Sequence, residues 1–188
     1  MRIISLIVKI ITLPGAILHT FFEHMSCRIC KILVDDAATI RFDEMLSHVD
    51  HQLVKRRAAN FDICFIPFLL NLVLGFLLLC NGSTMILYSG HYETIFNWVC
   101  LYLGFALCCN LFPQREDVYM LKETVYGKGS KSNLAIKIII APFYAVFRVG
   151  NLLEDTGLII FTSAGFAYLV PYILGLFVPK IYNALIQV

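Results

Sequence analysis

The chain has 188 residues, enough for one domain, and 59% of them are hydrophobic, against about 45–50% in soluble proteins. This composition predicts a single integral membrane domain over residues 1–188, with the lipid bilayer as its first partner. The net charge of +2 and the lack of a long run of like charges exclude nucleic acid as an expected partner. The seven cysteines are an odd number, which is not typical of a disulfide framework.

The first hydrophobic segment covers residues 3–22, which is about the length needed to cross a hydrocarbon core of roughly 30 Å. Pro14 and Gly15 interrupt it. Because a proline removes a helix hydrogen bond, we expect a kink here, with the part that contains His19 aimed separately. The N-terminus resembles a signal peptide but lacks a small-x-small cleavage site, so we expect this span to be retained.

A polar stretch follows at residues 25–60. Two short β-prone runs within it, Ile29–Val34 and Thr39–Phe42, favour a small β-hairpin. The segment Glu44–Ala59 could instead form an amphipathic helix on the membrane surface.

Four further hydrophobic segments complete the chain, at 62–80, 95–112, 134–153 and 157–178. Asn71 is the one strongly polar residue inside the first of them, and we expect it to form an interhelical hydrogen bond or to orient a ligand of a site. Lys137 and Arg148 in the third are interpreted as cations that snorkel to the interface, and this segment either crosses or lies flat. The sequence therefore predicts an all-α polytopic bundle of four to five transmembrane helices, with 134–153 and 157–178 as an antiparallel pair.

The distribution of cations predicts the topology. Loops 25–60 and 114–133 carry lysine and arginine, whereas 81–93 carries neither, so the first two are expected in the cytoplasm and the N-terminus outside. We expect the 114–133 loop to be basic and flexible. With this parity the ends of the first and third spans reach the same membrane face, which predicts that His19, Glu23 and Asp117 converge there.

Helical spacing groups several metal-binding side chains. At about 100° per residue, His19, Glu23, Cys27 and Cys30 fall within a wedge of roughly 80°, whereas His24 points about 140° away from His19. One face of this helix is therefore predicted to carry chemistry.

Three elements of the chain together resemble a family of small bacterial and archaeal integral-membrane metallopeptidases related to the site-2 proteases. These elements are Leu13-Pro14-Gly15 leading to His19, Cys27 in register after it, and the run Leu111–Asp117 after a later span. Ser47–His51 and Pro67–Asn71 are also similar to family stretches, so the resemblance covers residues 12–121. It implies a site-2-protease-like core, zinc held by His19 and the distal Asp117, and the inner membrane of a prokaryote.

Two positions depart from the family pattern. Thr20 occupies the position of the catalytic glutamate, and a threonine hydroxyl cannot take a proton from metal-bound water near neutral pH. Glu23 occupies the position of the second histidine, but an oxygen ligand four residues after His19 still points to the same side. The resemblance therefore leaves a zinc site of His19, Glu23 and Asp117 as a hypothesis, with His48, His51 or Asn71 in a supporting shell or as an alternative base.

A second metal hypothesis uses other residues. His24, Cys27 and Cys30, together with His48 and His51, supply enough nitrogen and sulfur ligands for a closed tetrahedral zinc site at the cytoplasmic face.

Three functions are carried forward. The first is a degenerate site-2-protease-like protein, proteolytically inactive, that binds another membrane protein or a transmembrane peptide. The second is an active membrane-embedded zinc metallopeptidase with an unconventional base, and the third is a small channel, transporter or membrane effector subunit.

Overall fold

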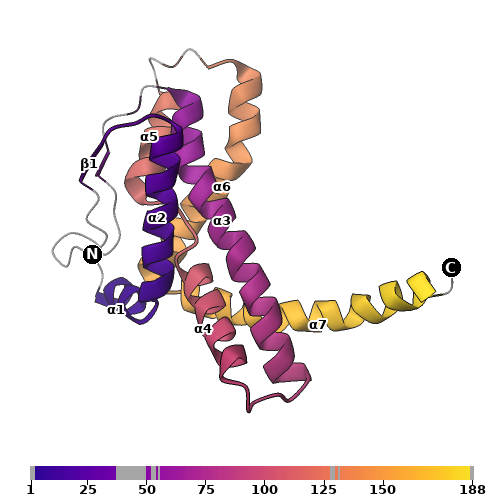
Figure 1. Ribbon diagram of the computed structural model, residues 1–188. Helices are drawn as coiled ribbons and strands as arrows, with labels where there is room; N and C mark the ends of the chain where they lie inside the picture. Colours follow the sequence, from indigo (N-terminus) through magenta and orange to yellow (C-terminus); the bar gives the residue numbers. More distant parts are fainter. Residues whose placement is uncertain are drawn as a thin grey trace.

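The computed structural model describes residues 3–36, 50–51, 54, 56–127, 130 and 132–186. Within these ranges the chain is almost entirely helical, with seven α-helices, one π-helical turn and two short strands (Figure 1). The predicted all-α class is therefore confirmed.

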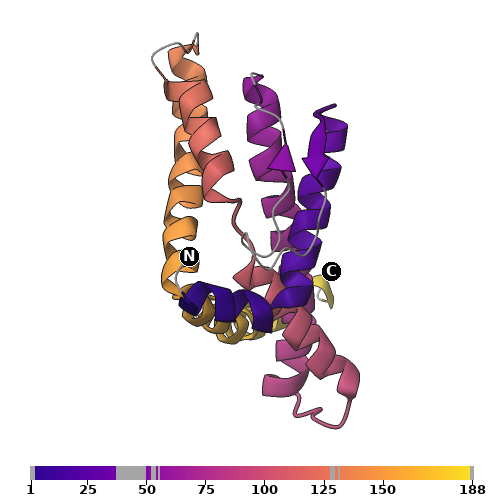
Figure 2. The same cartoon turned by 90° about the vertical axis from the view of Figure 1, so that its left-hand side faces the viewer.

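The first hydrophobic segment forms two helices, α1 (Ile3–Ile11) and α2 (Leu13–Ile29), which corrects the prediction of one span over 3–22. The chain bends at Thr12, whose hydroxyl donates a hydrogen bond to the Val8 carbonyl at 2.8 Å. Pro14 stands in the first turn of α2, where its missing N–H is not needed. As a result α1 lies crosswise to α2, which the two views of the ribbon show (Figures 1 and 2). The expected change of direction is present, just ahead of the proline.

The longest continuous helical segment among the described residues joins α3 (Arg57–Ser83) to the π-helical turn η1 (Thr84–Tyr88). It extends the predicted span 62–80 at both ends, so residues 81–88 are helical and not a loop as predicted. The next helix, α4 (Ile95–Cys109), packs against the second half of α3. Two glycines permit this close approach, because a Cβ on Gly82 would meet the Leu101 nitrogen at 2.5 Å and one on Gly104 the Leu79 nitrogen at 2.6 Å.

Helix α5 (Arg115–Tyr126) lies within the predicted flexible loop 114–133 and corrects that prediction. It is held by a stripe of apolar side chains spaced three or four residues apart, Val118, Leu121 and Val125, each no more than 2% exposed. These pack with Cys64 of α3 and with Ile140 and Phe147 of the following helix to form the hydrophobic core. The burial of these apolar side chains therefore makes the segment a packed helix, although its charged residues favoured a loop.

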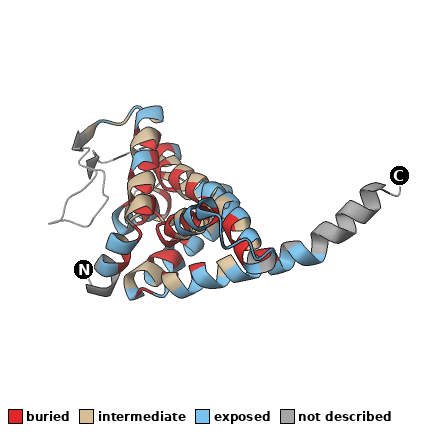
Figure 3. Cartoon of the chain, turned by 60° about the horizontal axis from the view of Figure 1, so that its bottom comes forward, coloured by how far each residue is buried: buried red, intermediate tan, exposed pale blue. Residues whose placement is uncertain are grey.

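Helix α6 (Leu134–Thr156) ends at Gly157, which has the positive φ of 75° that favours glycine, and α7 (Ile159–Ile186) follows. Both predicted hydrophobic segments are thus helical. The expected antiparallel pairing is wrong, because α7 runs crosswise to α6 and leaves the body of the molecule (Figures 1 and 3).

Two short strands, β1 (Val34–Asp36) and β2 (Asp50–His51), pair antiparallel. The first begins later than the predicted run Ile29–Val34, whose start belongs to α2. The predicted partner strand, Thr39–Phe42, lies outside the described residues, as does most of the alternative helix Glu44–Ala59.

Two helices are long and apolar enough to cross a membrane, namely Arg57–Leu87, which joins α3 to η1, and Leu134–Thr156, which is α6. Helix α4 and the segment Ile159–Ile173 of α7 are apolar but shorter. The described residues thus contain two candidate membrane crossings, of the four to five that the sequence predicted. The remaining crossings stay a prediction.

Candidate functional site

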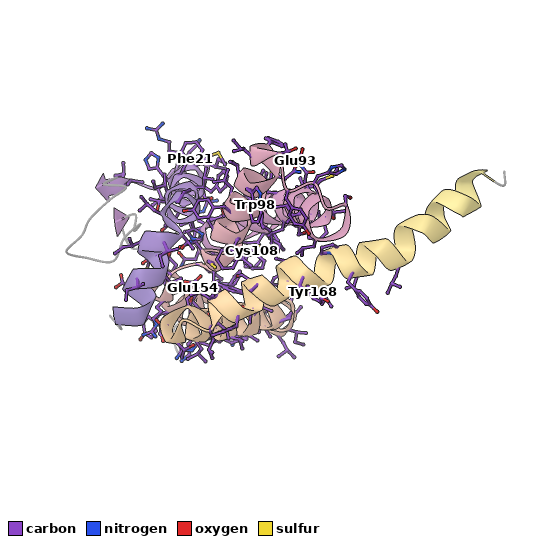
Figure 4. All side chains as sticks on the ribbon, turned by 90° about the horizontal axis from the view of Figure 1, so that it is seen from below. Phe21, Glu93, Trp98, Cys108, Glu154 and Tyr168 are labelled. Atoms are coloured by element: carbon purple, nitrogen blue, oxygen red, sulfur yellow. The ribbon has the colours of Figure 1, made fainter. Side chains whose placement is uncertain are left out.

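The candidate site follows one face of α2. The helix packs against α3 and α4. Four of its polar side chains, and that of the residue before it, are each at most 5% exposed: His19, Thr20, Glu23, Ser26 and Thr12. Neighbouring Phe21 points outward and is 58% exposed, as the side-chain view also shows (Figure 4). Of the predicted wedge, His19, Glu23 and Cys27 thus lie on the buried face of α2.

A hydrogen-bonded junction joins three helices at the middle of α3. The side-chain nitrogen of Asn71, which is fully buried, lies 2.7 Å from His19 Nδ1 and donates to the Asn110 carbonyl at 3.0 Å. The interhelical hydrogen bond predicted for Asn71 is thus present. Asn110 follows the last residue of α4, so α4 ends level with the centre of α3.

One side-chain nitrogen of Asn71 makes both contacts of the junction. The Asn110 carbonyl only accepts hydrogen bonds, so the Asn71 group that faces it is the NH₂ group. The contact of the same nitrogen with His19 Nδ1 joins α3 to α2, and its donor and acceptor depend on the tautomer of the ring.

Asn110 extends the junction to the bend between α1 and α2. Its side-chain nitrogen donates to the hydroxyl of Thr12 at 2.8 Å and to the Ala106 carbonyl at 2.9 Å, and it lies 3.2 Å from the Thr12 carbonyl. The Tyr102 hydroxyl donates to the Ile11 carbonyl at 2.7 Å. Sequence reasoning missed Asn110 and Thr12, although each is a polar residue beside an apolar run.

A second buried group lies nearer the start of α3. The charges of Glu23 and Asp117 both act on the thiols of Cys27 and Cys64, and the charge of Asp117 also acts on His19. Glu23 is 1% exposed, Asp117 4%, and both cysteines 0%. The structure therefore brings the three predicted ligands, His19, Glu23 and Asp117, into one buried region, inside the helix bundle and not at its end.

Proximity alone does not make a metal site. Among the residues that the structure describes, no group of three or more His, Cys, Asp or Glu side chains is arranged to hold a metal ion. The set of His19, Glu23 and Asp117 therefore stays a prediction.

The ligands of the second metal hypothesis, His24, Cys27 and Cys30, differ in how deeply they are buried. Cys27 is buried beside Glu23, His24 is half-buried, and Cys30 caps the end of α2. Burial raises the pKa of the Cys30 thiol, Asp62 adds to this and Arg56 opposes it, which disfavours the thiolate that zinc needs. His48 lies outside the described residues, and His51 is described only by its backbone in β2.

Thr20, at the position where the family resemblance expects a catalytic glutamate, is turned to its own helix. Its side chain is 3% exposed, and its hydroxyl donates to the Ala16 carbonyl at 3.1 Å. The hydrogen of this hydroxyl is thus used in a bond to the backbone of α2.

The end of α6 holds the connection between α4 and α5. Glu154 Oε1 accepts a hydrogen bond from the Phe112 N–H at 3.1 Å, and Asp155 forms an ion pair with Arg115. Glu154 is also close enough to the buried Cys109 of α4 for its charge to act on that thiol.

Comparisons of the chain with protein-family models, with curated proteins and with solved structures find no match.

Proposed function

We propose that this chain is an integral membrane protein with a site-2-protease-like core that binds another membrane protein or a transmembrane peptide without cleaving it. The proposal locates the chain in the inner membrane of a prokaryote with its N-terminus outside. The observation that carries it is Thr20, which stands where hydrolysis needs a general base and whose hydroxyl is bound to the Ala16 carbonyl.

Two further observations support a binding role. The buried polar groups of α2, α3 and α4 are bonded to one another, so the centre of the bundle is built for stability. The outer faces of α6 and α7 carry exposed apolar side chains, among them Ile138, Ile139 and Phe161, which are 64%, 64% and 74% exposed. Such faces are suited to lipid or to another apolar helix.

The test uses the full chain in phosphatidylcholine vesicles with a labelled 23-residue leucine–alanine transmembrane peptide. Binding is followed by energy transfer and cleavage by mass spectrometry, with and without added zinc. We expect saturable binding and an intact peptide in both conditions. Peptide cleavage that is lost in Asp117→Ala would overturn the proposal.

A matched variant tests the family register itself. Thr20→Glu combined with Glu23→His restores the family pattern on one face of α2, so the double variant is expected to bind zinc more tightly than the parent chain. If metal analysis finds no gain, the resemblance on which the core assignment rests is wrong.

The second candidate, an active metallopeptidase, is favoured by one observation, the shared burial of His19, Glu23 and Asp117. It requires about one zinc ion per purified chain, reduced by Asp117→Ala. Sub-stoichiometric zinc that does not respond to Asp117→Ala would eliminate it.

A further inference from the structure

Arg148 is a charged residue on the outer surface of an otherwise apolar helix. It is exposed on α6, and other exposed residues lie within about 100° of it on the same side of the helix, forming a stripe: Ile138, Ala141, Ala145, Val149 and Leu152. Ile138, Val149 and Leu152 are 64%, 56% and 54% exposed. If α6 crosses the bilayer, this stripe is in contact with the hydrocarbon.

The depth of Arg148 distinguishes it from Lys137 on the same helix. At 1.5 Å per residue, Arg148 lies about 12 Å from the end of α6 at Thr156 and about 21 Å from its start at Leu134. Each Cα–Cβ bond is tilted toward the start of the helix, so the arginine points toward the more distant end. Lys137 is only about 4.5 Å from the start and points toward it. Lys137 is therefore placed to snorkel to lipid headgroups, and Arg148 is not.

Within the part of the chain that the structure describes, Arg148 has no counter-charge. Among the described residues it forms no ion pair and no hydrogen bond, since Asp155 pairs with Arg115 and Glu154 accepts from Phe112. An unpaired charge near the bilayer centre costs about 2.5–3.5 kcal/mol or more. A partner at the same depth would remove much of this cost.

We propose that the face of α6 around Arg148 binds a transmembrane helix of a second protein that carries an aspartate or glutamate at matching depth. The inference deepens the proposed function and rests on it, because it requires α6 to cross the bilayer. The complementary charge decides the partner's chemistry, and the small side chains of Ala141 and Ala145 let a helix approach closely.

A second copy of this chain does not meet the requirement. Symmetric pairing through this face would set one Arg148 against the other. Of the carboxylates whose side chains the structure describes, the exposed ones, Glu93, Glu116 and Glu123, lie outside α3 and α6. A heterologous acidic helix is therefore the occupant that the charges favour.

The experiment uses the full chain in uncharged phosphatidylcholine vesicles and four labelled 23-residue leucine–alanine peptides with Glu, Gln, Leu or Arg at the centre. We expect the Glu peptide to bind the parent chain about tenfold more tightly than the Leu peptide, a difference of about 1.4 kcal/mol. Arg148→Gln should abolish this preference, and the matched Lys137→Gln variant should keep it. Arg148→Glu should transfer the preference to a peptide with a central arginine.

The outcomes separate the two proposals. Equal binding of all peptides to the parent chain, or a preference for Glu that survives in Arg148→Gln, would overturn the inference and leave the proposed function standing. A chain that alkaline carbonate extracts from the vesicles would overturn both. The thermal unfolding of each variant is compared with that of the parent chain as a control for folding. Misfolding also cannot explain the Arg148→Glu result, because that variant is expected to reverse the preference and not to lose it.

Discussion

At the scale of single residues, Asn71 has the largest consequences. One amide nitrogen, buried in the middle of α3, bonds both to His19 of α2 and to the carbonyl that ends α4. Because water is excluded there, each partner depends on Asn71 for its hydrogen bond. The side chain therefore sets the relative height of three helices.

Replacing this residue should be costly. Asn71→Leu leaves His19 Nδ1 and the Asn110 carbonyl without their partner, and we expect the free energy of unfolding to fall by about 1–3 kcal/mol. Asn81→Leu is the control on the same helix, because Asn81 is exposed and makes only a long contact of 3.9 Å to Cys100 Sγ. Denaturant unfolding in detergent measures both. Equal losses in the two variants would contradict the role assigned to the junction.

The sequence predicted this junction only in part. Asn71 was recognisable because it is a single amide within a long apolar run. Asn110 and Thr12 were not, since polar residues are ordinary at the ends of hydrophobic segments, and the pair is separated by 98 positions in the chain. Long-range pairing of this kind leaves no local pattern to read.

At the scale of elements, the close packing of α2 against α4 depends on a glycine, which has no side chain. A Cβ on Gly15 would lie 2.1 Å from the Ala106 carbonyl oxygen, so α2 and α4 touch through backbone. The contact also holds the start of α2 beside the end of α4, where the polar junction forms.

Gly15→Ala should push these helices apart. The clash is with backbone and not with a flexible side chain, so we expect a loss of about 1–3 kcal/mol of stability. Gly165→Ala is the matched control in α7, because nothing lies within 4 Å of its Cβ position. There the better helix propensity of alanine should leave stability unchanged or raised by up to about 1 kcal/mol. Unfolding curves of the two variants that coincide would refute the close contact.

The end of α6 allows a comparison of two neighbouring acids. Glu154→Leu removes the acceptor of the Phe112 N–H and should cost about 1–3 kcal/mol, whereas Glu154→Gln keeps an acceptor and should cost less. Asp155→Asn weakens an ion pair with Arg115, whose side chain is 56% exposed, so its effect should stay below about 1 kcal/mol. The same unfolding assay ranks the three variants, and a larger loss in Asp155→Asn than in Glu154→Leu would show that the assignment is reversed.

Elements were predicted well where apolar length decides them and poorly where packing does. The cores of α3, α4, α6 and α7 follow from long apolar runs. Helix α5 was predicted as a loop because the segment is rich in charged residues. The spacing of Val118, Leu121 and Val125, which marks a helix face, is short and easily overlooked beside them. The bend at Thr12 precedes Pro14 because proline is accommodated in a first turn and does not break the helix that it begins.

For the whole molecule, the positions of the connections specify an orientation. The end of α2, the start of α3 and the connection from α5 to α6 lie together at one end, and the connection from η1 to α4 lies at the other (Figure 2). Arg28 at the end of α2, Arg57 at the start of α3 and Lys122 in the second half of α5 thus lie toward one side, as the positive-inside rule requires if that side is cytoplasmic.

Reporter fusions test this orientation. Alkaline phosphatase fused after residue 90 should be active, because that connection is expected outside, and green fluorescent protein fused after residue 130 should fluoresce, because that connection is expected inside. Exchanging the two reporters supplies the control, since both signals should then vanish. The opposite pattern would invert the topology.

The shortness of α4 has a consequence for how the chain is made. Its 15 residues measure about 22 Å, less than the roughly 30 Å of the hydrocarbon core, so this helix cannot complete a crossing alone during synthesis. Gly82 and Gly104 hold it against α3, which does have the length. We therefore expect the two to enter the bilayer together as a helical hairpin, with α3 made first and α4 packing against it at Gly82 and Gly104.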